Sequence, residues 1–399
     1  MMSKKVPELR FKGFTDDWEE RKLGNYIIQY SEKTKQNNQY PVLTSSRNGL
    51  FFQKDYYKGN QIASEDNTGY NIVPRGYFTY RHMSDDLVFK FNINDIADYG
   101  IVSTLYPVFT TNEQLDSKYL QYQLNEGSEF KRFSLLQKQG GSRTYMYLNK
   151  LQNMILTIPK LEEQQKIGSF FKHLDDTIAL YQRKLDLLIE QKKGFLQKMF
   201  PKHGEKVPEL RFAGFADDWE EHKVGNFLSE SKIKGSDGSV SKKLTVKLWR
   251  KGIVPKEEIY KGSSATQYYI RLAGQFMYGK LDFLNQAFGI LPNELDGYES
   301  TLDSPAFDFK DGINPNFFLE YVCRENFYKY QGNIANGSRK AKRIHADTFF
   351  DMPITIPNFE EQQKIGSFFK QLDDTIALHQ RKLDLLKEQK KGFLQKMFV

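Results

Sequence analysis

The sequence has few of the features that define secreted, membrane or metal-binding proteins. Cys323 is the single cysteine in 399 residues, so an internal disulfide framework is excluded. No run approaches the roughly 18 apolar residues that a membrane-spanning helix requires. The opening MMSKKVPELRF lacks the apolar stretch of a signal peptide. We therefore expect a cytoplasmic protein that does not enter a membrane.

Signatures of catalysis are also weak. GQFMYGKL at 274–281 has the spacing of a phosphate-binding loop, but Leu281 replaces the Ser or Thr that would ligate magnesium, and a strand is the better interpretation. NPNF at 314–317 is similar to a motif of amino-methyltransferases, yet no glycine-rich cofactor loop follows a strand pattern. The six histidines show no metal-ligand spacing, and Cys323 has no local nucleophile signature. We expect no catalytic residue, metal site or cofactor in this chain.

The bulk composition indicates a folded chain of two or three domains, with 39% hydrophobic and 15% aromatic residues. Its 58 Lys and Arg against 50 Asp and Glu give a net charge of +8. That balance permits an anionic partner without requiring one.

The chain repeats itself once. Residues 5–25 and 206–226 are identical at 17 of 21 positions, and residues 162–200 and 360–398 at 36 of 39. We call these the matched blocks. The segments between them, roughly 26–158 and 227–356, differ strongly in sequence but have nearly the same length, and Pro107 and Pro305 occupy equivalent positions. The order of the chain is therefore variable segment, helix, variable segment, helix.

The variable segments predict mixed structure. Short alternating runs such as YNIVPRGYFTY favour strands, and stretches such as NPNFFLEYVCRENFYKY have helical spacing. We expect an α+β fold with two similar domains, residues 1–158 and 202–356, separated by two long helices, residues 159–201 and 357–399.

The long matched blocks carry apolar residues at steps of four and three, which is a heptad seam. In the first block this seam is formed by Ile167, Phe171, Leu174, Ile178, Tyr181, Leu185 and Leu188, and in the second by Ile365, Phe369, Leu372, Ile376, His379, Leu383 and Leu386. Each helix could extend about 58 Å, more than one turn of B-form DNA at roughly 34–36 Å. We expect an antiparallel intramolecular coiled coil with pseudo-two-fold symmetry and Tyr181 near His379. Simple oligomerisation is the alternative.

The repeated order of PELRF, GF.DDW.E, a variable segment, and IP with EEQQKIG opening a heptad helix resembles the specificity subunit of type I restriction-modification systems, over essentially the whole chain. The resemblance implies a DNA-binding protein whose two target-recognition domains each read one half of an asymmetric bipartite site in double-stranded DNA. It also implies two methyltransferase subunits and translocating restriction subunits as partners. S-adenosylmethionine would belong to the methyltransferase subunit.

Candidate DNA contacts lie in loops rich in Arg, Lys and Asn, because these side chains read base edges in the major groove. In the first segment, TSSRNG supplies Ser45, Ser46, Arg47 and Asn48, and the equivalent TVKLWRKG supplies Lys247, Trp249, Arg250 and Lys251. Arg81 and His82 are matched by Lys280, and two later loops supply Arg143 and Tyr145, and Arg339, Lys340, Lys342 and Arg343. The basic run 339–343 suits phosphates better than bases. Each of these residues could instead be a solvated charge or a packed aromatic.

Two other functions remain open. A methyltransferase acting alone would bind the cofactor in a titration, although the missing cofactor loop argues against it. A coiled-coil adaptor for proteins would give no sequence-dependent retention of DNA by the assembled complex.

The isolated chain is expected to bind DNA weakly. Residues 26–150 carry 14 Lys and Arg against 12 Asp and Glu, and residues 227–357 carry 18 against 15, so neither segment attracts phosphates strongly. Methyltransferase partners would complete the DNA-binding surface. Affinity for duplex DNA as a function of salt concentration tests this, and tight, specific binding by the purified chain alone would contradict it.

Overall fold

The computed structural model of the chain describes residues 6–59, 63–138, 143–202, 204–238, 242–257, 266–334 and 343–398. Its contacts divide it into two compact units. The first unit comprises Met1–Gln182 with Arg381–Val399, and the second comprises Arg183–Gln380. Each unit therefore contains one α+β domain and part of both long helices.

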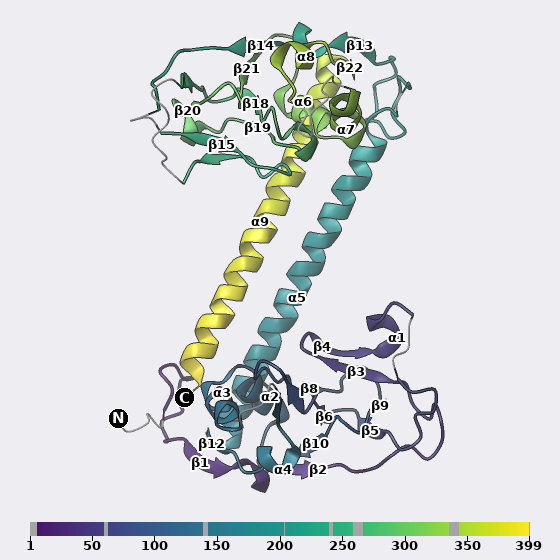
Figure 1. Cartoon of the computed structure of the whole chain (residues 1–399), viewed down its shortest axis with the longest axis vertical. Helices are drawn as coiled ribbons and strands as arrows, with labels where there is room; N and C mark the ends of the chain where they lie inside the picture. The colour runs from purple at the N-terminus through teal and green to yellow at the C-terminus, as the bar shows by residue number, and fades with distance from the viewer. Residues whose placement is uncertain are drawn as a thin grey trace. The chain divides into compact units, whose positions relative to one another are not determined.

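The described residues of the first unit form short strands, several short helices and parts of both long helices (Figure 1). Its strands are β1 (Glu19–Lys22), β2 (Ile27–Gln29), β3 (Leu43–Ser46), β4 (Gly49–Phe52), β5 (Asn71–Pro74), β6 (Phe78–Thr79), β7 (Met83–Ser84), β8 (Asn92–Ile93), β9 (Tyr99–Val102), β10 (Val108–Thr111), β11 (Thr144–Tyr145) and β12 (Ile155–Ile158). Its helices are η1 (Leu23–Asn25), α1 (Gln53–Tyr56), α2 (Ser117–Glu126), α3 (Ser128–Leu136), α4 (Leu148–Leu151) and the beginning of α5 (Leu161–Lys198).

The second unit has a similar order of elements. Its strands are β13 (Glu220–Lys223), β14 (Leu228–Ser231), β15 (Leu244–Val246), β16 (Ile253–Pro255), β17 (Tyr269–Ile270), β18 (Phe276–Tyr278), β19 (Phe288–Ile290), β20 (Glu299–Ser300), β21 (Ala306–Phe309) and β22 (Pro353–Ile356). Its helices are η2 (Val224–Asn226), η3 (Phe283–Asn285), η4 (Asn293–Leu295), α6 (Pro315–Val322), α7 (Glu325–Ile334), α8 (Ala346–Phe350) and the beginning of α9 (Phe359–Met397).

The two domains share one topology. A four-stranded antiparallel sheet has the order β2-β10-β6-β8 in the first unit and β14-β21-β18-β19 in the second. Strand β1 pairs with β12, and β13 pairs with β22, in the same antiparallel register. The hairpin β3–β4 corresponds to β15–β16. The variable segments have therefore kept a common frame, and the expectation of two similar mixed α and β domains is confirmed.

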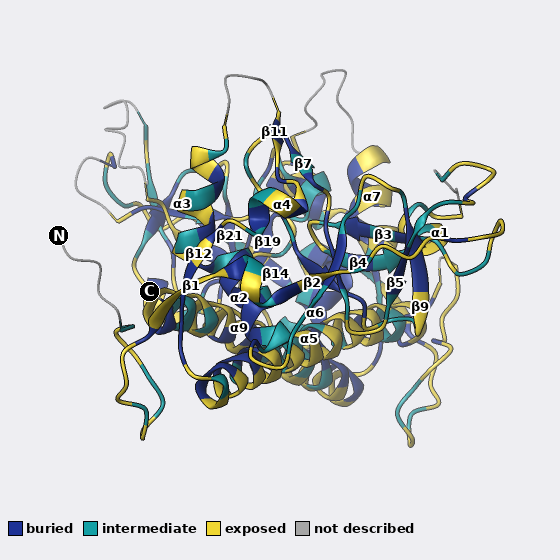
Figure 2. Ribbon diagram, turned by 90° about the horizontal axis from the view of Figure 1, so that it is seen from below, coloured by how far each residue is buried: buried dark blue, intermediate teal, exposed yellow. Residues whose placement is uncertain are grey.

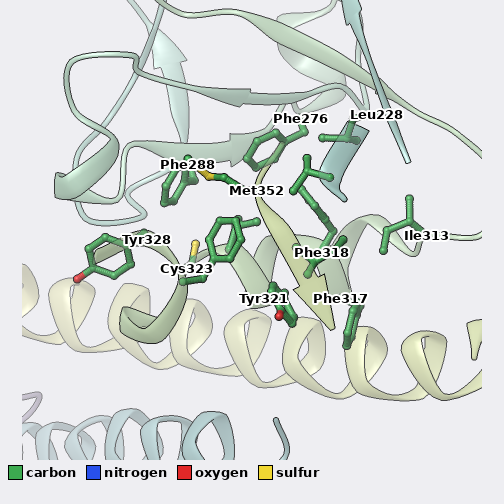
Figure 3. Close-up of a cluster of buried hydrophobic side chains, with 14 of the residues drawn as sticks. Leu228, Phe276, Phe288, Ile313, Phe317, Phe318, Tyr321, Cys323, Tyr328 and Met352 are labelled. Carbon is green, nitrogen blue, oxygen red and sulfur yellow. The ribbon is translucent and has the colours of Figure 1, made fainter. Parts of the chain in front are cut away.

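Each domain packs on its helices through an aromatic cluster. In the first unit, Trp18 contacts Tyr119 with ring centroids 6.2 Å apart, and Phe398 stacks on Phe171 at 5.7 Å. The second unit repeats the arrangement with the equivalent rings of Trp219, Phe317, Phe200 and Phe369. Figure 3 shows the core of that unit, in which Phe317 and Tyr321 lie toward the long helix and Phe276 and Phe288 lie toward the strands.

The EEQQKIG sequence that opens each long helix makes the contact with the domain. Glu163 accepts two hydrogen bonds from Arg10, at 2.9 and 2.7 Å, and Glu361 accepts two from Arg211, both at 2.8 Å. The same PELRF segments reach the end of the other long helix, because Leu9 N–H donates to the Lys396 carbonyl. The first matched block thus binds the start of one helix and the end of the other.

The glycine in that sequence lets a domain helix approach closely. A Cβ atom on Gly168 would lie 2.7 Å from the Asp116 Oδ1 that caps α2, and 2.9 Å from the Tyr119 amide nitrogen. A Cβ on Gly366 would lie 2.8 Å from the equivalent Phe317 nitrogen at the start of α6. Any larger residue would push the domain away from its helix.

The long helices pack antiparallel within each unit. In the first unit the rings of Phe170 and Phe393 are 5.1 Å apart and Asp175 pairs with Lys390 at 2.6 Å. Residues later in α5 therefore contact residues earlier in α9, which is the pattern of an antiparallel pair. In the second unit Lys192 pairs with Asp373, and Phe195 lies 5.0 Å from Phe368. The expectation of an antiparallel helix pair is confirmed in both units.

All the seam residues predicted from the sequence are buried or half-buried. The buried ones are Ile167, Phe171, Leu174, Leu185, Ile365, Phe369, Leu383 and Leu386, and the half-buried ones are Ile178, Tyr181, Leu188, Leu372, Ile376 and His379. The remaining faces of both helices are largely exposed, as the yellow bands in Figure 2 show. Tyr181 and His379 fall in different units, so their expected proximity stays a prediction.

The helix boundaries differ slightly from the sequence prediction. Helices α5 and α9 begin at Leu161 and Phe359, two residues after the predicted starts, and end at Lys198 and Met397. Since each compact unit includes part of both helices, the helices are structural elements of the units and not separate domains.

The fragments that resembled enzyme motifs have structural roles. Phe276–Tyr278 of GQFMYGKL form strand β18, and Asn314 of NPNF caps helix α6 by accepting a hydrogen bond from the Phe317 amide. Within the residues that the structure describes, no group of His, Cys, Asp and Glu has the arrangement of a metal site. No helix of this described part is both long and apolar enough to cross a bilayer.

Phe171→Ala should destabilise the isolated chain by about 3–5 kcal/mol, because it removes a fully buried ring that packs against Tyr122 and Phe398. Leu180→Ala on the same helix is the control. Its side chain is 46% exposed, so the free energy of unfolding should change by less than about 0.5 kcal/mol. Urea unfolding measures both values, and equal effects would show that the aromatic cluster does not hold the domain on its helix.

Candidate nucleic-acid interface

The β3–β4 hairpin presents the first set of candidate residues. Ser45 is buried, where its hydroxyl donates to the Thr79 carbonyl and accepts from Asn92. Ser46 donates to the Gly49 carbonyl across the turn and accepts from the Asn48 amide. The two serines thus shape the hairpin, while the side chains of Arg47 and Asn48 are exposed at its tip.

Two adjacent carboxylates each bind one exposed arginine of this domain. Arg47 makes a bidentate pair with Asp86 at 2.8 and 2.6 Å, and Arg143 binds Asp85 at 3.0 Å. Hydrogen bonds from Arg47 and Ser84 hold the pKa of Asp86 below its usual value. All four charged side chains are at least half exposed, so these pairs contribute little to stability and can be exchanged for contacts with phosphate or bases.

The candidate loop that contains Arg143 and Tyr145 lies beside the segment around Arg81 and Asp85, because strand β11 pairs with strand β7. Tyr145 on β11 lies opposite Met83 on β7, and the ring of His82 is 5.0 Å from Tyr147 and 5.8 Å from Tyr145. His82 is buried, with Nδ1 close to the Leu105 carbonyl oxygen, so it packs between loops and is not displayed on the surface. Arg81 beside it is exposed.

The β3–β4 hairpin, the end of α1 and residues from the segment 81–90 line a cleft of about 390 Å³, to which the Arg143 loop does not contribute. Ser45, Ser46, Arg47, Asn48 and Arg81, all predicted from the sequence, line it. Sequence reasoning missed other residues of the wall, namely Tyr56, Tyr57, Asp85, Lys90 and Tyr106. It also missed Asp86, which pairs with Arg47 beside the cleft. The SDD sequence at residues 84–86, shortly after Arg81, was an available signal for those acidic partners, since carboxylates near arginines commonly pair with them.

The β15–β16 hairpin of the second domain has a different tip. Trp249 and Arg250 both have φ of 57°, in the left-handed region that side chains disfavour. Their amides are held by the carbonyls of Asn285 and Gln286, at 2.8 and 3.1 Å. Trp249 is 56% exposed, and Lys247 and Lys251 are also exposed. The tip therefore displays an aromatic ring between two ammonium groups, a combination that suits stacking and phosphate contacts.

Arg250 differs from the sequence prediction. Its guanidinium points inward, where it binds Glu320 of α6 with two hydrogen bonds, at 2.8 and 2.5 Å, and lies 3.5 Å from Asp373 of α9. The prediction that Arg250 reads bases does not fit this placement, because a guanidinium held inside the unit cannot also reach a groove of DNA. The tip sequence alone gave no sign of this partner.

Lys280 and Arg343 meet elsewhere in the second domain, around Asp303. The Lys280 amide donates to the Asp303 carbonyl, and Arg343 lies 3.4 Å from the Asp303 carboxylate. Lys280 is 8% exposed, and this burial lowers the pKa of its ammonium. Only Arg343 of this pair is well placed for solvent or phosphate. Arg339, Lys340 and Lys342 lie outside the described residues.

The fold therefore defines a class of proteins with an internal duplication. Such a protein has two α+β domains of one topology, each with an exposed hairpin, and an antiparallel pair of long helices. The family model described as type I restriction modification DNA specificity domain matches residues 15–191 and 306–388. The chain therefore belongs to this family. The resemblance drawn from the sequence is confirmed, and with it the role in DNA sequence specificity.

Comparison with individual proteins agrees. The putative type I restriction enzyme MjaX specificity subunit of Methanocaldococcus jannaschii is 22% identical, covering 95% of this chain and 92% of its own length. The type I restriction enzyme MjaVIII specificity subunit of the same organism is 22% identical over 74% of this chain and 72% of its own length. The crystal structure of the S subunit from M. genitalium has the same fold, with a TM-score of 0.62, 11% identity and 99% of each chain covered.

Asp85→Asn with Asp86→Asn should strengthen non-specific DNA binding by the complex that contains this chain. The change frees Arg47 and Arg143 from their carboxylates and removes two negative charges, one in the cleft and one beside it. Plots of log affinity against log salt concentration should become steeper by up to about two, because roughly one counterion is released per added phosphate contact. An unchanged slope would place these arginines away from the DNA. Asp98→Asn, which loses an exposed pair with Arg75 outside the cleft, is the matched control.

Proposed function

We propose that this chain is the specificity subunit of a type I restriction-modification complex, in which each domain reads one half of an asymmetric bipartite site in double-stranded DNA. The observation that carries the proposal is the duplication itself. Two domains keep the same topology and the same attachment to their helices, while their hairpins carry TSSRNG in one and TVKLWRKG in the other. Two domains that share a fold but expose different hairpin residues are suited to recognising two different DNA sequences.

The displayed residues support different targets for the two domains. The first domain offers Arg47, Asn48 and Arg81 around a cleft, and Arg or Asn can make bidentate contacts with guanine or adenine. The second offers Trp249 between Lys247 and Lys251 on a hairpin tip. Because the two sets differ in charge geometry and shape, the two halves of the DNA site should differ in sequence.

The helices support a second role in binding partner subunits. Each long helix exposes two leucines at equivalent positions, Leu180 and Leu187 on α5 and Leu378 and Leu385 on α9, with 46–64% of each side chain accessible. Exposed apolar residues that repeat with the heptad period suit contacts with further helices. Two methyltransferase subunits, one for each copy of this sequence, fit that repetition, and restriction subunits would join them.

Catalysis would then belong to the partners. The methyltransferase subunits would bind S-adenosylmethionine and transfer the methyl group, and the restriction subunits would translocate and cut the DNA. This chain would contribute no catalytic side chain and would act on DNA in the cytoplasm. In support, the fragments that resembled enzyme motifs form a strand and a helix cap.

Exchanging residues 26–150 for the corresponding segment of another specificity subunit should change one half of the methylated site and leave the other half and the spacing unaltered. Methylome sequencing of cells that produce the chimaera with its methyltransferase subunit measures this directly. A chimaera carrying a new segment at 227–356 is the reciprocal control and should change the other half only. If either exchange altered both halves, the assignment of one half-site to each domain would be wrong.

A further inference from the structure

A largely buried cluster of four charged side chains joins the second hairpin to the helices. The Lys192 ammonium lies 2.5 and 2.6 Å from the two Asp373 oxygens and 3.1 Å from Glu320 Oε1. Arg250 binds both oxygens of Glu320 and approaches Asp373 at 3.5 Å. The four residues come from α5, α9, α6 and the β15–β16 hairpin, and all belong to the second unit.

The cluster is balanced in charge and three of its members are shielded from water. Its two cations face two anions; the side chains of Glu320, Lys192 and Arg250 are 3%, 11% and 20% exposed, and that of Asp373, at the edge of the cluster, is 43% exposed. Burial alone would raise the pKa of Glu320, but hydrogen bonds and charges from Arg250 and Lys192 outweigh it and lower that pKa. Removing one member would leave a buried charge without its partner, so the members depend on one another.

The first unit has only part of this arrangement. Lys390 and Asp175, equivalent to Lys192 and Asp373, pair at 2.6 Å. Tyr122 takes the place of Glu320 and donates its hydroxyl proton to Asp175 at 2.7 Å. The first hairpin does not join this group, because Arg47 at its tip pairs with the exposed Asp86. The two domains therefore hold their hairpins in different ways.

We propose that Arg250 is a positioning residue that ties the tip of the second hairpin to the helix pair, so that recognition of the second half-site depends on the buried cluster while recognition of the first does not. This inference rests on the proposed function, in which each domain reads one half-site. Arg250 touches no base. It acts by fixing Trp249, Lys247 and Lys251, which are the exposed members of the hairpin.

The backbone of the hairpin supports this role. Trp249 and Arg250 adopt successive left-handed conformations, which cost free energy in residues with side chains. Two backbone hydrogen bonds to Asn285 and Gln286 and the ion pairs of Arg250 hold the tip in this shape. Without Arg250 the tip would be free to relax to commoner conformations, and Trp249 would lose its fixed direction.

The test compares variants of the full chain in the complex with its methyltransferase subunit, by methylome sequencing. Arg250→Met and Glu320→Gln should each relax the second half of the methylated sequence, with about tenfold less discrimination at one or more base pairs. The first half and the spacing should be unchanged. Tyr122→Phe, at the position equivalent to Glu320, is the matched control and should leave both halves intact, since no hairpin residue depends on it.

The double variant Arg250→Met, Glu320→Leu guards against simple unfolding. It removes one cation and one anion together and leaves the Lys192–Asp373 pair balanced, so the chain should fold and assemble. The second half-site should still be relaxed. A double variant that does not fold contradicts the proposal, because a tether confined to the hairpin is dispensable for folding.

The remaining outcomes separate this inference from the proposed function. Relaxation with Arg250→Met but not with Glu320→Gln would mean that Arg250 contacts DNA itself, and relaxation of both halves or of neither would show that the cluster does not position one reader. Each of these results overturns the inference. If the unmodified chain directs methylation to a site without two separate halves, the proposed function fails instead.

Discussion

The heptad seam is the interaction on which the rest of the molecule depends. A single helix whose apolar residues follow at alternating steps of three and four would expose that apolar face to water, so each long helix requires a partner along its length. The chain supplies that partner itself, because the second copy of the sequence carries the same seam. Lys192 and Lys390 interrupt the apolar pattern at equivalent positions, and each is satisfied by an aspartate of the other helix. Polar residues at such positions favour one register of a helix pair over its alternatives.

The matched blocks carry a set of contacts between each domain and its helices that is repeated in both units. The arginine of PELRF binds the second glutamate of EEQQKIG, the glycine of that sequence admits a capped domain helix, and a tryptophan packs on the phenylalanine that ends the other helix. These contacts use a few residues at fixed spacing. The hairpins lie outside this set, and their residues could therefore diverge without loss of the frame.

The duplicated domains and the helices with heptad spacing could both be predicted from the sequence. The duplication gave the two domains, and the steps of three and four gave seam residues that are all buried or half-buried. The same reasoning could not separate Arg47 from Arg250. Both precede a turn in equivalent hairpins, but one faces an exposed aspartate and the other a buried glutamate seventy residues later in the chain. A local pattern indicates which residues a loop contains, whereas the direction of a long side chain depends on distant partners. The buried serine and histidine, Ser45 and His82, illustrate the same limit.

The lysine–aspartate pair between the helices also has a meaning for how such a protein can change. Both members of the pair belong to the matched blocks, while the residue that completes it comes from the variable segment, Tyr122 in one domain and Glu320 in the other. In each unit the lysine–aspartate pair of the helices thus forms a hydrogen bond with one polar side chain that the variable segment supplies. A different domain placed between the blocks could therefore complete this pair with either a hydroxyl or a carboxylate on the helix equivalent to α2 or α6, so the displayed residues can change while the long helices stay the same.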